Sequence, residues 1–339
     1  MYMVIKKISV ENFTVFEKTV VNFCDGINVL IGENATGKTH LLKLLYTFCK
    51  AANSRNKEIW VRAYPMFLDR YFLFAGFYLD NDTIIKINDD TVYDYKLLRS
   101  NANKPEPDGF EFDEGIGFDS EVINSVFIPA KEMLSMSNII RLNEKYSRAL
   151  NIEHTLLDVI KQAQSLKPDF IPNIAKSIAP ILEKTINGTV FVNPVDNTFW
   201  VKKTDGSKIP FSMEAEGFRK LGLIWQLLMN ESITNGTILF WDEPEANINP
   251  KLVSVMVEIF LELSRQGVQI FLATHDYILA KYFEVRRNEH DAVLFHSMYI
   301  TDEGVKCESD NDFRNLTKNP IISAFDELMD EVITGNLGD

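Results

Sequence analysis

The feature that most constrains this chain is the segment IGENATGKTH at residues 31–40, which contains the complete phosphate-binding pattern G-x-x-x-x-G-K-T. An apolar run precedes it and leucines at helical spacing follow it, so a strand, a loop and a helix are predicted in that order. Glycines at both ends of the loop let its backbone N–H groups surround phosphate oxygens at a helix N-terminus, whose dipole favours anions. The segment therefore predicts a nucleoside triphosphate site; the alternative is a chance match.

Each position of this P-loop has an expected role. The Lys38 ammonium is expected to reach the β and γ phosphates, and the Thr39 hydroxyl to bind Mg²⁺. ATP and Mg²⁺ are the predicted cofactors. The loop residues expected to contact the nucleotide are Gly32, Glu33, Asn34, Ala35, Thr36, Gly37, Lys38, Thr39 and His40.

A second segment, TILFWDEP at residues 237–244, predicts the acidic half of the site. It reads as an apolar strand that ends in adjacent carboxylates, and ligands of open α/β sheets bind at the carboxyl ends of strands. Asp242 is expected to hold Mg²⁺, and Glu243 to polarise a water molecule toward the γ phosphate. The alternative is an ordinary solvated strand end.

A third segment is the predicted strand at residues 268–273, which is followed by His275. A histidine at this edge can donate a hydrogen bond to the γ phosphate or to the attacking water. The alternative is a core or surface histidine. Lys38, Glu243 and His275 form the predicted catalytic set.

The bulk composition fits a globular protein of one large domain or two modest ones: 339 residues, 46% hydrophobic. No apolar run approaches the roughly 20 residues that span a bilayer and no signal peptide is evident, so a cytoplasmic protein without membrane contact is expected. Three scattered cysteines predict neither a disulfide framework nor a zinc site. A net charge of −13 argues against nucleic-acid binding by bulk electrostatics, although one basic groove remains possible.

The order of the predicted elements suggests three parts. Residues 1–130 form an N-terminal lobe with the P-loop and an antiparallel β subdomain, 131–188 a helical insertion, and 189–339 a C-terminal lobe. Helices within 131–186 are expected to be separated by Pro168, Pro172 and Pro180. The acidic stretch at 104–121 favours a solvated loop over an acidic binding site.

Together the segments GENATGKT, FWDEP followed by EANINP, and FLATHD resemble the ATP-binding-cassette superfamily, specifically its soluble RecF/OLD/SMC-like ATPases. The resemblance implies an α/β P-loop fold with a mixed sheet. It identifies Asp242 and Glu243 as the Walker B pair, residues 245–250 as the D-loop and His275 as the switch histidine. OLD-like relatives carry a metal-dependent nuclease domain, and none is expected here.

Other family elements are divergent. In the signature segment, residues 215–221, the pair Glu216-Gly217 replaces the usual Ser-Gly, which leaves Gly217 and the helix N-terminus to contact a phosphate; the alternative is a plain core helix. The Q-loop position, residues 128–132, has no glutamine, so Lys131 or Glu132 couples to Mg²⁺ or the segment is a structural turn. Phe13 and Phe16 either stack on adenine or, as slightly favoured, pack in the core.

If the signature helix is used, it acts on a nucleotide held by another subunit, which predicts a head-to-tail homodimer around ATP. The first hypothesis for function is an ATPase subunit that controls a separately encoded effector, in anti-phage defence or a toxin–antitoxin-like system. The second is a RecF-like DNA-binding repair ATPase, and the third retains ATP only as a structural ligand. The amphipathic helix at 321–333 either packs on its own domain, as favoured, or docks a partner.

Overall fold

The computed structural model describes residues 2–53, 79–88, 90–94, 122–132, 134–137 and 153–336. The predicted strands between residues 59 and 78 lie outside these ranges, as do the predicted acidic loop at 104–121 and the middle of the helical insertion.

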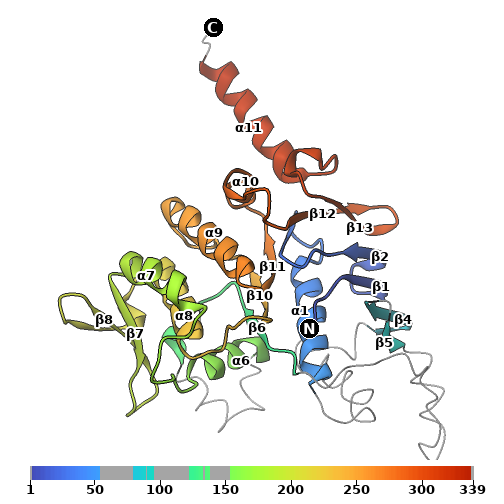
Figure 1. Cartoon of the computed structure of the whole chain (residues 1–339). Helices are drawn as coiled ribbons and strands as arrows, with labels where there is room; N and C mark the ends of the chain where they lie inside the picture. The colour runs from blue at the N-terminus through green and yellow to red at the C-terminus, as the bar shows by residue number, and fades with distance from the viewer. Residues whose placement is uncertain are drawn as a thin grey trace, which may run out of the picture.

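A six-stranded mixed sheet forms the centre of the protein (Figure 1). Its strand order is β13-β12-β3-β11-β10-β6, and every neighbouring pair is parallel except β12 with β13. Three of these strands, β3, β6 and β11, are buried along their length, as expected for parallel strands covered by helices, which explains their continuous apolar sequences. The strands are β3 (Ile27–Gly32), β6 (Ser125–Ile128), β10 (Ile238–Asp242), β11 (Gln269–Thr274), β12 (Val293–Thr301) and β13 (Gly304–Asp310).

Alternating side chains of these strands divide the core into two layers. Leu30 and Phe240 point into the layer that contains α1 (Lys38–Ala52). Val29 and Trp241 point into the other layer, with the helices α8, α9 and α10. Full burial of each large apolar side chain contributes about 1.5–3 kcal/mol, so both faces hold the sheet in place. These helices are α8 (Glu216–Met229), α9 (Pro250–Arg265) and α10 (Tyr277–Arg286).

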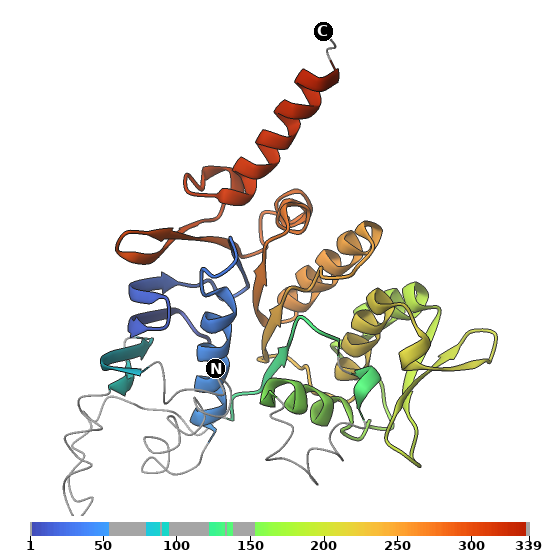
Figure 2. The same ribbon diagram turned by 180° about the vertical axis from the view of Figure 1, so that it is seen from behind.

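An antiparallel sheet of order β2-β1-β4-β5 packs on the α1 side. In both views it lies on the opposite side of the central sheet from α7, α8 and the β7–β8 hairpin (Figures 1 and 2). The mixed sheet with an N-terminal antiparallel β subdomain therefore confirms the predicted α/β fold class. The strands are β1 (Lys7–Phe13), β2 (Phe16–Asn22), β4 (Leu79–Ile87) and β5 (Asp90–Asp94).

The described part of the helical insertion contains one correction. Pro180 was expected to separate two helices, but it lies inside α7. The side chain is exposed on the solvent face, where water can bond to the carbonyl of residue 176 that proline leaves without a partner. The three-stranded sheet β7-β8-β9 follows. The elements are α6 (His154–Ala163), α7 (Ala175–Ile186), β7 (Gly188–Val192), β8 (Phe199–Lys203), β9 (Lys208–Pro210) and the short 3-10 helices Leu134–Met136 and Phe211–Met213.

The last helix, α11 (Pro320–Asn336), follows the 3-10 helix Phe313–Asn315 and points away from the body (Figures 1 and 2). Its start packs on the domain: Ile321 is buried and the Phe325 ring stacks on Tyr277 at 4.1 Å. Leu328 and Val332 are 54% and 45% exposed. The favoured expectation of packing along this helix is therefore wrong for its second half. Within the described ranges, no helix has the length and apolar character needed to cross a bilayer.

Candidate nucleotide-binding site

The P-loop connects the carboxyl end of β3 to the start of α1, as predicted. Gly37 has φ of 84° and caps the helix without a side-chain hydrogen bond. A Cβ atom there would lie 2.6 Å from the Phe16 ring and 2.7 Å from Val15, so the position needs glycine for both conformation and space. The first N–H groups of α1 have no side-chain cap and no acidic residue in the first turn, which leaves them available to an anion.

Two aromatic residues beside this loop belong to the core. Phe13 and Phe16 are 2% and 1% exposed and pack among the apolar residues around α1. The favoured alternative, core packing, is therefore confirmed, and stacking of either ring on adenine is wrong because no ring face is free. The predicted nucleotide contact His40 lies next to the segment that carries these rings, and its Nδ1 is 3.1 Å from the Thr14 hydroxyl.

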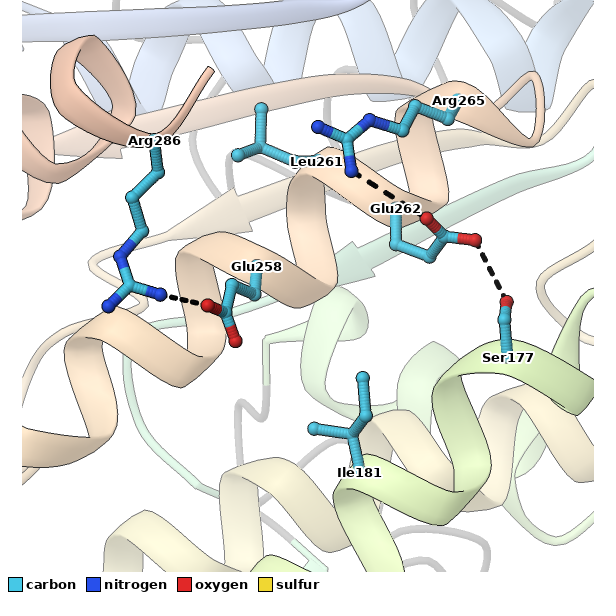
Figure 3. Close-up of a pocket in the computed structure, with 7 residues that line it drawn as sticks. All are labelled: Ser177, Ile181, Glu258, Leu261, Glu262, Arg265 and Arg286. Carbon is cyan, nitrogen blue, oxygen red and sulfur yellow. Dashed lines mark hydrogen bonds and ion pairs between the residues drawn. The ribbon is translucent and has the colours of Figure 1, made fainter. Parts of the chain in front are cut away.

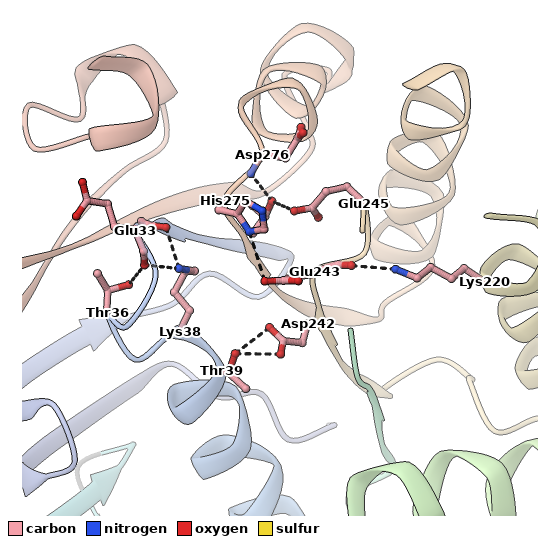
Figure 4. Close-up of polar contacts among 12 residues, drawn as sticks. Glu33, Thr36, Lys38, Thr39, Lys220, Asp242, Glu243, Glu245, His275 and Asp276 are labelled. Atoms are coloured by element: carbon pink, nitrogen blue, oxygen red, sulfur yellow. Dashed lines mark hydrogen bonds and ion pairs between the residues drawn. The ribbon is translucent and has the colours of Figure 1, made fainter. Parts of the chain in front are cut away.

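Lys38 lies folded over its own loop (Figure 4). Its ammonium donates hydrogen bonds to the carbonyl oxygens of Gly32 at 2.8 Å and Glu33 at 2.7 Å. Burial lowers the pKa of Lys38, while the nearby carboxylates of Asp242 and Glu243 oppose that change. The lysine and the acidic pair therefore share one electrostatic environment.

Thr39 and Asp242 meet across the sheet. The Thr39 hydroxyl lies 3.0 Å from Asp242 Oδ1 and 2.9 Å from Oδ2. Burial raises the pKa of Asp242 to about 6, and the hydrogen bond from Thr39 acts in the opposite direction. A hydroxyl and a carboxylate are the hard oxygen ligands that Mg²⁺ prefers, so this pair fits the predicted ion. In the described residues no group of three or more acidic, histidine or cysteine side chains is placed to hold a metal, so phosphate oxygens and water would complete the coordination.

Glu243 and His275 form the outer part of the site. The Glu243 carboxylate lies 3.4 Å from His275 Nδ1, and both side chains are partly exposed, at 35% and 52%. Glu243 has φ of 45°, and its N–H bonds to the carbonyl of Ala273 at 2.8 Å. β11 lies between β3 and β10, and the parallel register brings the ends of all three strands to one edge. A carboxylate and an imidazole at this edge can orient a water molecule toward a phosphate.

Two further contacts in the described residues were not predicted by the sequence. Glu245, 9% exposed, accepts a hydrogen bond from the Thr274 hydroxyl at 2.6 Å. Lys220 is 1% exposed, and its ammonium turns inward to the Walker B turn (Figure 4). The available signal was its position three residues after Gly217 and four before Ile224, on the buried face of α8.

The divergent family elements lie around the N-terminal end of α8. Gly217 is buried against α9 in this single chain, and a Cβ atom there would lie 3.0 Å from Leu252. At the Q-loop position, Glu132 pairs with Arg219 at 3.2 Å and accepts the N–H of Ser135. Glu132 therefore links the turn to α8, while coupling to Mg²⁺ stays a prediction.

A separate hollow of about 480 Å³ lies among α7, α9 and α10 (Figure 3). Arg286 pairs with Glu258 there, and Glu262 accepts a hydrogen bond from Ser177 at 2.9 Å. The predicted nucleotide-binding residues do not line this hollow. Its lining residues are Ser177, Ile181, Glu258, Leu261, Glu262, Arg265 and Arg286.

Comparison with known families agrees with this geometry. Residues 3–113 match a family model described as an AAA ATPase domain. Residues 129–280 match a model described as an AAA domain, putative AbiEii toxin, of a type IV TA system. The chain carries AAA ATPase domains.

Sequence relatives of this AAA ATPase include the DNA replication and repair protein RecF of Bacillus thuringiensis (strain Al Hakam) and of Bacillus cereus (strain B4264). Each is 42% identical over 56 residues, which is 16% of this chain. The match spans only 15% of each RecF chain.

Solved structures similar to this AAA ATPase include an Smc head bound to the C-winged helix domain of ScpA, with 14% identity and a TM-score of 0.47. That match covers 91% of this chain and 98% of the Smc head. The SMC head domain from Thermotoga maritima is 12% identical with a TM-score of 0.43, covering 91% of this chain and 100% of that domain.

Proposed function

We propose that this AAA ATPase binds ATP and Mg²⁺ between the P-loop and the Walker B turn, and that ATP joins two copies of the chain head to tail. The observation that supports this is the placement of Thr39 against Asp242, with Lys38 in the same electrostatic environment. Residues far apart in the sequence thereby form one oxygen-rich, partly buried edge beside an uncapped helix N-terminus.

In the proposed site each side chain has one task. Lys38 exchanges its carbonyl partners for phosphate oxygens. Thr39 and Asp242 hold Mg²⁺, which neutralises phosphate charge when bound. Glu243 orients the attacking water, and His275 donates a hydrogen bond to the γ phosphate or to that water. Gly32–His40 supply backbone N–H groups around the phosphates.

The proposed dimer completes the site with the N-terminus of α8. The first N–H groups of this helix would face the nucleotide held by the partner copy, since α8 has no side-chain cap, while Gly217 lets α8 pack closely on α9. The γ phosphate then joins two surfaces that separate after hydrolysis. ATP therefore acts as a reversible link between the copies.

The function that this cycle serves, in our proposal, is control of a separately encoded effector in a bacterial defence or toxin–antitoxin-like system within the cytoplasm. The match of residues 129–280 to a model named for a putative AbiEii toxin supports this choice. A second candidate, RecF-like DNA repair, is favoured by the 56-residue match to RecF. The net charge of −13 favours the first candidate, because non-specific DNA binding needs positive charge.

The test of the proposed site is Glu243→Gln, with Glu289→Gln on the exposed surface as the matched control. We expect Glu243→Gln to lower turnover about 100-fold or more and to produce a stable dimer with ATP and Mg²⁺ in light-scattering measurements. The control should hydrolyse ATP normally. Wild-type turnover by Glu243→Gln would contradict the role of Glu243, and an unchanged mass with ATP would favour ATP as a structural ligand.

The two candidate functions are separated by what the trapped dimer binds. Affinity purification of the Glu243→Gln protein with ATP or with ADP, from cells that express its neighbouring genes, should recover an effector protein only with ATP. Duplex DNA binding that requires ATP and weakens steeply with salt would instead support repair.

A further inference from the structure

Lys220 is a buried lysine whose hydrogen bonds all go to one turn of the backbone. Its ammonium donates to the carbonyl oxygens of Ala246 at 2.8 Å, Glu243 at 3.1 Å and Pro244 at 3.4 Å. The residue is 1% exposed, and burial lowers its pKa, opposed by several surrounding glutamates. An ammonium has three N–H donors, so the turn occupies the full hydrogen-bonding capacity of this group.

The turn that Lys220 holds is conformationally strained. Glu243 has φ of 45°, a region that costs a residue with a side chain about 1–3 kcal/mol and persists only where neighbouring contacts enforce it. The Glu243 carbonyl accepts one backbone hydrogen bond within the turn, from the N–H of Ala246 at 3.1 Å. The ammonium therefore supplies a second partner to the carbonyl of the same residue whose carboxylate faces His275.

The opposite side of this turn is also anchored. Glu245 accepts a hydrogen bond from the Thr274 hydroxyl, and this hydroxyl accepts one from the N–H of Asp276 at 2.9 Å. This chain connects the turn to the end of β11 beside His275. Lys220 connects the same turn to α8, so the turn lies between α8 and the end of β11, the strand that leads to His275 (Figure 4).

We propose that Lys220 is a positioning residue that couples the N-terminal end of α8 to the Glu243 carboxylate. This inference rests on the proposed function, in which Glu243 orients water and α8 meets the partner's nucleotide. Lys220 lies one helical turn beyond Glu216, so a shift of the α8 N-terminus on a phosphate moves the ammonium and the three carbonyls with it. Glu243 then reaches its working position only in the closed dimer.

The test compares Lys220→Met, which keeps the unbranched side chain but removes the donors, with Lys184→Met on the exposed face of α7. We expect Lys220→Met to lower kcat about 30-fold or more while the Kd for ATP stays within about threefold, because the P-loop is unchanged. ATP-dependent dimerisation of Lys220→Met should persist. Lys220→Arg, which keeps charged donors, should recover part of kcat. If the Met variant does not fold, the kcat and the Kd for ATP of Lys220→Arg are compared with those of the wild type instead.

A double variant distinguishes positioning from a general loss of structure. In the Glu243→Gln background, Lys220→Met should lower the residual rate by less than about twofold, because its effect passes through Glu243. Additive losses, a parallel loss of ATP affinity, or full activity of Lys220→Met would overturn the inference while leaving the proposed function intact. Wild-type activity of Glu243→Gln alone would instead refute the proposed role of Glu243.

Discussion

The Thr39 hydroxyl lies within hydrogen-bonding distance of both carboxylate oxygens of Asp242, at 3.0 and 2.9 Å, although 203 positions separate the two residues in sequence. The contact joins the first turn of α1 to the end of β10. It places the two groups that would share a magnesium ion on facing elements, and it sets the electrostatic state of the site.

The first prediction concerns the pH dependence of stability. Burial raises the pKa of Asp242 from 3.8 to about 6, so the folded protein holds a proton that the unfolded chain releases. This contribution to stability is complete below about pH 4 and is lost as pH rises through about 6. Asp242→Asn should therefore stabilise the nucleotide-free protein by up to about 3 kcal/mol above pH 6 and by little near pH 4. Urea unfolding across this range, with Asp302→Asn as the exposed control, measures the difference; a gain independent of pH would contradict it.

The second prediction concerns Lys38. Lys38→Ala should reduce ATP affinity about 100-fold or more, because alanine has no ammonium to donate charge-assisted hydrogen bonds to the phosphates. Titration with a fluorescent ATP analogue measures this loss. Lys184→Ala, which removes an exposed charge on α7, should bind normally. Retained affinity in Lys38→Ala would remove the phosphate assignment.

The third prediction concerns His275. Since its Nδ1 lies 3.4 Å from Glu243 and the side chain is half exposed, His275→Ala should leave the fold intact and lower kcat about 10–100-fold. ATP affinity should change by less than about threefold. Steady-state kinetics of this variant and of His290→Ala, an exposed histidine, provide the comparison. Equal rates for both variants would show that His275 takes no part in turnover.

The fourth prediction separates backbone strain from crowding at the P-loop. Gly37 and Gly206 have similar φ values, 84° and 87°, but only Gly37 has atoms close to the position of a Cβ. Gly206→Ala should cost about 1 kcal/mol, the penalty of the left-handed conformation alone. Gly37→Ala should cost about 2 kcal/mol more, because Phe16 and Val15 must move, and ATP affinity should fall as well. Equal losses in thermal unfolding would mean that Phe16 and Val15 accommodate a methyl group without cost.

The sequence by itself determined the strand, loop and helix of the P-loop, because glycine spacing and apolar periodicity act locally. It also placed Asp242, Glu243 and His275 at strand ends, since buried parallel strands read as continuous apolar runs. Local patterns did not reveal that Pro180 lies within a helix, because solvent on its exposed face can satisfy the carbonyl that proline leaves free.

Only the tertiary structure decided which groups meet. The insertion of β11 between β3 and β10 fixes the distance between Thr39 and Asp242, and sequence separation carries no information about that order. The inward turn of Lys220 depends on the backbone carbonyls of residues 243, 244 and 246. The exposure of Leu328 depends on where the body of the domain ends beneath α11. Hydrophobic patterns state that a residue is buried, but packing between distant segments determines what it is buried against.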